Sequence, residues 1–509
     1  MGIQIWHIIG IAAVLLLIAG VSLYSGKKVK NAADFTTGGG KVGRWMVCGT
    51  IMGSLVGGQA TVGTAQLAFN YGAAAWWFTL GSGIGCLALA LGYAVRLRRG
   101  GSGTLLGIIS NEYGSTARYV GSLFSSVGIF ISVIAQVVSA VALISSVVSV
   151  NSVMAAVTAI ALMAIYVVFG GLWGAGMGGV VKLILLYLAA IAGCIMALTL
   201  SGGFGGLLSN LKGALVNTEL GALSGIESAG DISGRFFSLV ARGPAKDLGS
   251  GLSLLLGVLS TQIYGQAVMS AKSDGEARRG ALLSTFLIPP IGAACILIGL
   301  FMRGHYITTA EIAALQAAGQ AIPAGMTEIA STAQVFPMFV IRHMNPLLGG
   351  VVLGTLFITI VGGGAGLSLG TATVLLNDLF KKATDRLPTP EKKLLVTRLT
   401  IIGVLIAAAG VALGTSGAVI NDLGFLSMGL RGAVIFIPLT CALFLPGRVD
   451  SRWVVASEVC AAIAVVAGKL AGIGIDPLFI GVAASLLCCL VGMGVKKGGG
   501  KSLASGAAG

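Results

Sequence analysis

GSLVGGQATVG at residues 53–63 and GVLSTQIYG at residues 257–265 are the two stretches that decide the fold. In each, glycines and polar side chains interrupt a run of apolar residues. Unwound backbone in the middle of a membrane supplies free N–H and C=O groups, so paired broken helices indicate the binding site of a secondary transporter. Either stretch alone is explained better by glycines that let helices pack closely. Their matching positions in two blocks of spans favour the broken-helix interpretation.

Outside these stretches the chain consists of further apolar runs. Runs of about twenty apolar residues predict about thirteen spans, near 5–25, 46–71, 74–95, 119–149, 152–170, 173–200, 250–271, 281–302, 347–376, 397–416, 418–445, 453–471 and 477–495. The blocks 46–200 and 250–445 hold five spans each and have opposite orientations. The sequence therefore predicts one all-α transmembrane domain over residues 1–509: an extra helix at 5–25, a first repeat at 46–200, a second repeat at 250–445 and two C-terminal helices at 453–495.

The composition excludes several classes of protein. Of the 509 residues 56% are hydrophobic, and 32 basic with 17 acidic residues are fewer charges than an ordinary soluble domain carries. The net charge of +15 does not indicate nucleic-acid binding, because the basic residues form short clusters between apolar runs. Most of them lie at the span ends that share one side of the membrane. Basic residues favour the cytoplasmic side, so this distribution predicts an outer N-terminus and a cytoplasmic C-terminus. The expected setting is the inner membrane of a bacterium. The run at 5–25 has no cleavage site after it and is expected to be retained.

The sequence offers no constellation for catalysis. The eight cysteines lie in apolar stretches without the spacing of a zinc site, so no metal or other resident cofactor is expected. A membrane enzyme would need convergent acid–base groups, and a channel would need a continuous polar lining. A sensor would carry a signalling domain, yet only a short tail follows the last span. Transport of a small organic solute across the lipid bilayer is favoured, with no obligatory protein partner.

Short motifs recur in a fixed order along the chain. They are Ala33-Asp34-Phe35 with Gly38-Gly39-Gly40, Gly63-Thr64-Ala65 with Tyr71-Gly72, Gly170-Gly171-Leu172-Trp173, Ala271-Lys272-Ser273 with Ala277-Arg278-Arg279-Gly280, and Asn377-Asp378-Leu379-Phe380. With these motifs the sequence resembles the solute:sodium symporter family over nearly its whole length. The resemblance implies a LeuT-type fold of five plus five inverted spans with an extra helix before them. It also implies uptake of a small organic solute coupled to an inward sodium gradient.

The chain departs from that family at the implied sodium site. Two adjacent hydroxyl residues of the ninth span usually close this site, but Gly362 and Gly363 stand there, with Thr359 one turn earlier. In the sixth span the family usually carries an acidic residue three positions before a glutamine, and Gly179 and Lys182 stand in their places. The site has therefore lost side-chain oxygens and gained an ammonium group.

A lysine in this place affects the choice of coupling ion, sodium or proton. Sodium needs several hard oxygen ligands, and the other ligands that the resemblance implies are the backbone carbonyls of Gly53 and Val56. Lys182 could fill the vacated position and bind and release a proton during transport, as in some proton-coupled relatives of this fold. The hypothesis is sodium-independent transport, either proton-coupled through Lys182 or facilitated. Two alternatives stay open: the lysine reaches the cytoplasmic interface without a role, or sodium is coupled through other ligands.

Polar side chains of the broken helices and of a neighbouring span are the candidate solute ligands, namely Gln59, Thr61, Gln136 in the fourth span, Thr261 and Gln262. Each could instead form a hydrogen bond between helices. Arg431 lies about fourteen residues into the eleventh span, near the middle of the bilayer, where a cation should meet an anion. It either binds a carboxylate-bearing solute or pairs with Glu458. The expected solute is anionic or zwitterionic, a carboxylate or an amino acid.

Overall fold

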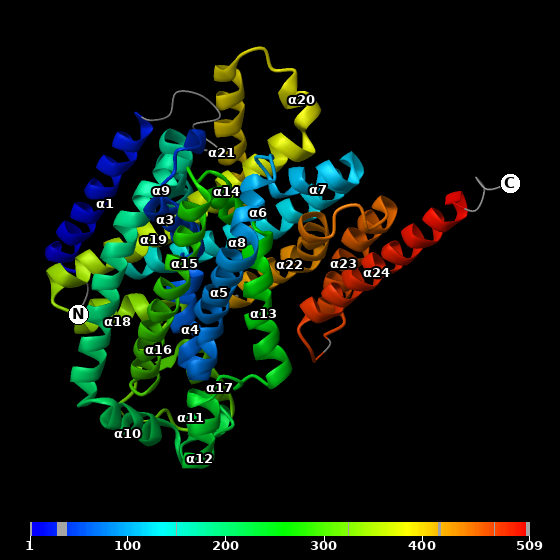
Figure 1. Ribbon diagram of the computed structural model, residues 1–509. Coiled ribbons are helices and arrows are strands. Elements are labelled where there is room, and N and C mark those ends of the chain that lie inside the picture. The colour runs from blue at the N-terminus through cyan, green and yellow to red at the C-terminus, as the bar shows by residue number, and fades with distance from the viewer. Residues whose placement is uncertain are drawn as a thin grey trace.

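A computed structural model describes residues 3–27, 38–148, 150–323, 325–415, 419–472 and 474–504. Within these ranges the chain is almost entirely helical, and its helices pack side by side into one bundle (Figure 1). This agrees with the all-α membrane fold that the apolar runs predict. The motif at 33–35 lies outside the described residues, as do the side chains at 168–170.

Long helices with several interruptions form the bundle. In chain order they are α1 (Ile5–Gly26), α3 (Arg44–Leu55), α4 (Thr64–Tyr71), α5 (Trp77–Ala88), α6 (Ala94–Arg99), α7 (Leu105–Tyr113), α8 (Ser115–Val147), α9 (Ser152–Ser201), α13 (Pro244–Ser260), α14 (Gln262–Met269), α15 (Asp274–Leu287), α16 (Pro289–Arg303), α19 (Pro346–Val374), α21 (Pro390–Gly414), α22 (Ile420–Phe444), α23 (Ser451–Leu470) and α24 (Pro477–Ala504). Wider π-helical turns continue some of them: η2 (Gln59–Gly63) before α4, η4 (Leu89–Tyr93) between α5 and α6, and η7 (Leu375–Leu379) after α19.

Both glycine-interrupted stretches are broken helices. The first helix, α3, ends at Leu55, and Val56 has the non-helical angles φ −83° and ψ 83° before the chain coils again. The second helix, α13, ends at Ser260, and Thr261 has φ −98° and ψ 123°. The axes of α13 and α14 then differ by 47°. Each break frees backbone groups inside the bundle, as the paired pattern predicts.

The expected number of thirteen spans is not confirmed. In the described part of the chain, ten helices are long and apolar enough to cross a membrane, or up to 11 if α13 and α14 form one bent span. The difference has two causes. The residues of the expected spans 46–71 and 74–95 give one candidate span, Gln59–Arg99, because the preceding α3 has only 12 residues, and Ser152–Val167 is a short apolar helix. Gly171, with φ 49° and ψ −135°, divides α9 between the expected spans 152–170 and 173–200.

Two long loops carry short elements of their own. The first holds α10 (Phe204–Leu215), α11 (Glu219–Leu223) and α12 (Ala229–Ile232), and the second holds α17 (Thr309–Ala317) and α18 (Val335–His343). The second loop also contains two short parallel strands, β1 (Tyr306–Thr308) and β2 (Thr327–Ile329), with Ile307 opposite Glu328. The purely helical expectation missed this small sheet, because three-residue strands leave no periodic pattern to detect.

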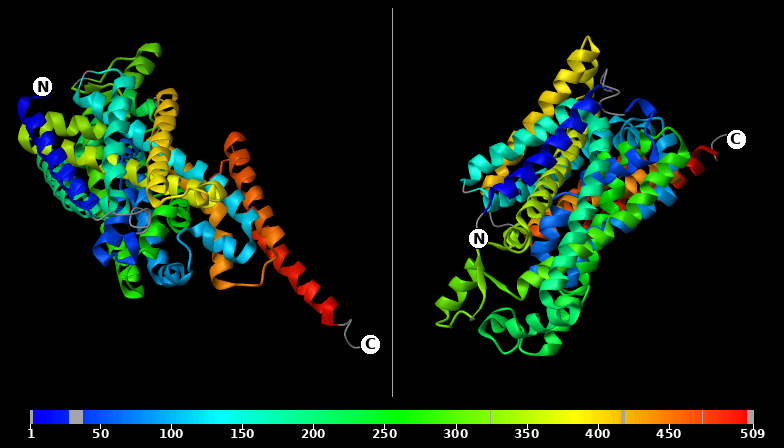
Figure 2. Two further views of the ribbon diagram at one scale, coloured as in Figure 1. Left: turned by 90° about the horizontal axis from the view of Figure 1, so that it is seen from above. Right: turned by 90° about the vertical axis from the view of Figure 1, so that its left-hand side faces the viewer.

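The extra helix α1 lies at one edge of the bundle, and α23 and α24 lie at the opposite edge (Figures 1 and 2). One stripe of α1 is buried against α9 and α19: His7, Gly10, Val14, Ile18, Ser22 and Ser25. Their spacing of three or four residues is that of one helix face. Glycines of α19 permit the contact, since a Cβ at Gly354 would lie 3.0 Å from Cβ of Val14.

Close packing of α3 on α9 positions the candidate ion site. A Cβ at Gly53 would lie 3.0 Å from the carbonyl oxygen of Ala175, and one at Gly179 would collide with the carbonyl oxygen of Gly49. These glycines allow the two backbones to approach where larger residues would keep them apart. Lys182 is three residues after Gly179, so the same approach brings its side chain to the end of α3.

Gly179→Ala is expected to destabilise the protein by about 1–3 kcal/mol, the usual cost of overpacking a tight contact. The measurement is the thermal unfolding of the purified protein in detergent. Gly403→Ala on α21 is the matched control, because a Cβ added there meets no atom of the described residues within 4 Å beyond the backbone of its own helix. Equal melting temperatures for the two variants would show that the α3–α9 contact is looser than described.

Candidate functional site

The ammonium group of Lys182 lies between the first helix break and α19. Its Nζ donates hydrogen bonds to the carbonyl oxygens of Gly53 (2.7 Å), Val56 (2.6 Å) and Thr359 (3.2 Å). The carbonyl of Gly53 is available because α3 unwinds there, and the N–H of Gly57 donates to Leu55 rather than to Gly53. The residue is only 1% exposed, so its side chain does not extend to the membrane interface.

Gly362 and Gly363, which stand where the family usually carries hydroxyl residues, lie at different distances from this lysine. A Cβ at Gly362 would lie 3.7 Å from Cδ of Lys182 and 3.6 Å from the carbonyl oxygen of Gly53, so this glycine borders the ammonium site directly. Gly363 instead faces the first break, where its Cβ would lie 3.1 Å from Cα of Gly57. The hydroxyl of Thr359 has no hydrogen-bond partner in the described part of the chain.

These residues do not fit a sodium ion at this position. The carbonyl oxygens that would be its ligands already accept hydrogen bonds from an ammonium group, and a second cation beside it would be repelled. The structure thus brings Gly53, Val56, Lys182, Thr359 and Gly362 together in one place. Their role in coupling stays a prediction.

Arg431 of α22 forms a second buried cationic centre with 0% exposure. Its Nε donates to the carbonyl oxygen of Ser427 at 3.0 Å, and one terminal nitrogen donates to Oγ1 of Thr261 at 2.9 Å. The other terminal nitrogen donates to the hydroxyls of Ser132 (3.1 Å) and Ser427 (2.9 Å). The guanidinium group therefore joins α8 and α22 to the second helix break.

Glu458 is not the partner of Arg431. The ion pairs among the described residues do not join these two side chains. Glu458 is buried in α23 against α8, where a Cβ at Gly121 would lie 2.9 Å from its Oε1. The bonds that the structure gives to the guanidinium group all go to neutral atoms. The pairing alternative is thus not observed, and binding of a carboxylate solute stays a prediction.

Two glutamines meet at the first break. Oε1 of Gln136 accepts a hydrogen bond from the N–H of Gly58 at 2.7 Å, and its Nε2 lies 3.5 Å from Oε1 of Gln59. Nε2 of Gln59 is buried and has no hydrogen-bond partner among the residues that the structure describes, so its N–H groups could serve a ligand. Thr61, by contrast, donates its hydroxyl to the carbonyl oxygen of Gly57 in the first break, at 3.0 Å.

Gln262 lies at the second break but bonds in another direction. Its Oε1 accepts from the N–H of Leu105 at 3.0 Å, and its Nε2 donates to the carbonyl oxygen of Gly103 at 3.2 Å. These contacts tie α14 to the segment that enters α7. The described hydrogen bonds of Gln262 therefore do not connect it to Gln59 and Gln136 at the first break. Its neighbour Thr261 is bonded to Arg431.

Asn421 is a polar residue of the site that the sequence-based reasoning missed. It is 0% exposed, and neither atom of its amide has a partner in the described chain. Its side chain lies against Gly63 of η2, and one turn later a Cβ at Gly424 would lie 2.8 Å from Nε2 of Gln59. The available signal was an asparagine at the start of an otherwise apolar span, directly before Asp422.

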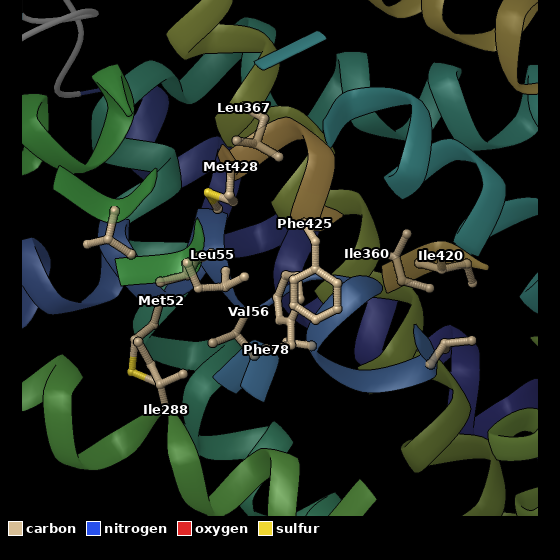
Figure 3. Close-up of a cluster of buried hydrophobic side chains, with 14 of the residues drawn as sticks. Met52, Leu55, Val56, Phe78, Ile288, Ile360, Leu367, Ile420, Phe425 and Met428 are labelled. Carbon is tan, nitrogen blue, oxygen red and sulfur yellow. The ribbon is translucent and has the colours of Figure 1, made fainter. Parts of the chain in front are cut away.

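Apolar side chains enclose the region between the two breaks. Figure 3 shows Val56 near Phe78 of α5 and Phe425 of α22, with Ile360 of α19 beside them. The ring centroids of Phe78 and Phe425 are 5.8 Å apart. A few unpaired polar groups inside an apolar enclosure are typical of small-molecule sites. Binding of a solute by these amides and the guanidinium group stays a prediction.

Comparisons with known proteins bear on the family and the fold. A sequence model of the sodium:solute symporter family matches residues 35–451. The chain is similar to a solved structure of the substrate-bound outward-open state of a Na+-coupled sialic acid symporter, with a TM-score of 0.75 and 18% identity over 97% of this chain and 98% of that chain. A mutant manganese transporter of Eremococcus coleocola gives a TM-score of 0.45 and 14% identity over 92% and 96%. The first likeness shows the expected LeuT-type fold.

The family match includes both helix breaks, Lys182 and Arg431. It therefore covers every side chain placed above in the two buried centres. This protein belongs to the sodium:solute symporter family, whose members are membrane transporters.

Proposed function

We propose that this protein is a secondary active transporter of a small organic solute that carries a carboxylate, either an organic acid or an amino acid. The observation that carries the proposal is the buried guanidinium group of Arg431, whose described partners are all neutral. A buried charge without a counter-charge is destabilising by several kcal/mol. A carboxylate that enters beside it would remove much of this cost and form charge-assisted hydrogen bonds.

The neighbouring residues support a solute of limited length. Ser132, which bonds Arg431, and Gln136, which meets Gln59, are four residues apart on α8, so they lie about 6 Å apart on one face. A carboxylate at the guanidinium group would leave the rest of the solute near the amides of Gln59 and Asn421. The amide oxygen of Asn421 can accept from an ammonium group, and Nε2 of Gln59 can donate to a hydroxyl or carbonyl group.

For coupling we propose that Lys182 takes the place of the sodium ion. Its three hydrogen bonds to the carbonyls of Gly53, Val56 and Thr359 support this assignment. If these bonds break when the first helix moves, the ammonium group can release a proton, which makes the cycle proton-coupled. Family membership favours a second candidate, sodium-coupled symport through ligands other than these. In either case the proposed setting is a bacterial inner membrane, with the two long loops outside.

Replacing sodium by choline is expected to leave solute uptake unchanged within about two-fold, because Lys182 already occupies the implied cation position. A thermal-shift screen of carboxylates and amino acids would first identify a ligand, since a compound that binds the folded state raises its stability. Uptake of that compound is then measured in liposomes with sodium or choline outside, and with or without an inward proton gradient. Strict dependence on sodium would contradict the proposal and establish the sodium-coupled candidate.

A further inference from the structure

A cavity of about 550 Å³ opens where α6 and α22 end, and it shares no lining residue with the site described above. Arg96, Arg99 and Glu112 supply its charged groups, and Val95, Ala442 and Leu443 supply apolar wall. The helical spans to which α6 and α22 belong end at Arg99 and Phe444. The cavity therefore lies at the boundary between the hydrocarbon layer and the polar surface, where lipid headgroups are found.

Of the two arginines at this cavity, Arg99 has an acidic partner among the described residues and Arg96 does not. Arg99 contacts Asp274 at 2.5 Å, and Arg98 contacts the same carboxylate at 2.7 Å. Arg96 forms none of the ion pairs found in the described chain; it donates to the carbonyl oxygen of Gly92 at 3.2 Å. Its guanidinium carbon also lies 4.2 Å from the ring centroid of Phe444. Stacked in this way, the guanidinium group is held at the cavity with donors left for an anion.

Glu112 adds an acceptor to the same cavity. One of its carboxylate oxygens accepts a hydrogen bond from the N–H of Gly447, which fixes the end of α7 to the turn after α22. The cavity thus offers cationic donors and a carboxylate acceptor side by side. This combination suits a group in which a phosphate is linked to a hydrogen-bond donor.

We propose that this cavity binds the headgroup of a glycerophospholipid that carries a hydrogen-bond donor, as phosphatidylethanolamine and phosphatidylglycerol do. The phosphate would lie at Arg96 and Arg99, because a planar guanidinium group pairs with phosphate through two parallel hydrogen bonds. The ammonium or hydroxyl group would donate to Glu112. The upper part of the acyl chains would follow Val95, Ala442 and Leu443. Basic pockets between membrane helices bind lipid headgroups in this way.

The test is the thermal unfolding of delipidated protein in detergent, titrated with phosphatidylethanolamine, phosphatidylglycerol, phosphatidylcholine or inorganic phosphate. The first two lipids are expected to raise the melting temperature saturably, with at least a ten-fold lower half-maximal concentration than phosphatidylcholine, whose quaternary ammonium has no donor. Stabilisation by phosphatidylcholine at equal concentrations would overturn the role of Glu112 and with it the proposal. Equal stabilisation by inorganic phosphate would overturn the lipid as the source of the anion.

Substitutions at the cavity test whether the lipid binds there. The double variant Arg96→Gln with Arg99→Gln is expected to raise the half-maximal lipid concentration at least ten-fold. Arg279→Gln is the matched control, since this exposed arginine lies on α15, whose first residue Asp274 pairs with Arg99, yet it is not part of the cavity. Ala442→Phe fills the cavity without removing charge and is expected to weaken lipid binding equally. Unchanged lipid stabilisation of the double variant, or of Ala442→Phe if the double variant does not fold, would overturn the proposal.

Discussion

Lys182→Met is expected to abolish solute accumulation driven by a proton gradient, with uptake at least about 100-fold below that of the parent protein. The substitution keeps an apolar chain of similar length but removes the donor to three buried carbonyl oxygens. Removing one partner of a buried charged contact costs about 3–5 kcal/mol, which corresponds to a factor of about 100 to 4,000. Uptake into liposomes with an inward proton gradient is the measurement.

Two further variants make this result specific. Lys212→Met removes an exposed lysine of α10 and should leave uptake unchanged. Lys182→Gln combined with Gly362→Ser returns two side-chain oxygens to the site, and a Cβ at Gly362 meets no atom closer than 3.6 Å. We expect this double variant to gain stabilisation by sodium over choline in thermal unfolding. Proton-driven uptake that persists in Lys182→Met would show that coupling resides elsewhere.

Arg431→Lys is expected to weaken binding of the best carboxylate ligand at least about 30-fold. In the parent protein the guanidinium group uses four of its five N–H donors on Thr261, Ser132 and Ser427, so its positive charge and its remaining donor are held in a fixed direction. The shorter, single ammonium group of lysine cannot reproduce these contacts. Loss of one well-placed charged partner in a desolvated site costs about 2–5 kcal/mol. Titration calorimetry on the purified protein measures the change.

The control for this experiment is a second, uncharged ligand. The amide analogue of the same solute lacks the negative charge, so its weaker affinity should change little between the parent and Arg431→Lys. The difference between the two ligands then isolates the pairing of the carboxylate with Arg431. Equal affinity of both proteins for the carboxylate would remove Arg431 from the solute site and leave it as a structural link between α8, α22 and the second break.

The breaks could be predicted because their cause is local. Glycines and polar side chains inside an apolar run disfavour continuous helix, and the run at 257–265 ends one helix at Ser260 as expected. The count of spans could not be predicted in the same way. Whether a short helix such as Ser152–Val167 crosses a membrane alone depends on how its neighbours cover it, which apolarity along the chain does not record.

The candidate site also has one part that the sequence predicts and one part that it does not. The neighbourhood of Lys182 was anticipated, because the resemblance aligned Gly53, Val56 and Thr359 with it. Asn421 was missed because its importance depends on how α22 crosses η2 and brings its amide against Gly63. That crossing is a property of tertiary packing and leaves no trace in the spacing of residues along either helix.

The hydrogen bonds of Lys182 have a thermodynamic consequence. A sodium ion must be captured from solution, so the fraction of carriers that hold one rises and falls with the salt concentration outside the cell. A cation attached to the chain is present at a fixed effective concentration set by its covalent link. Occupancy of this position is then independent of salinity. If coupling runs through Lys182 as proposed, the proton electrochemical gradient would drive uptake, and the transporter would keep working in fresh water.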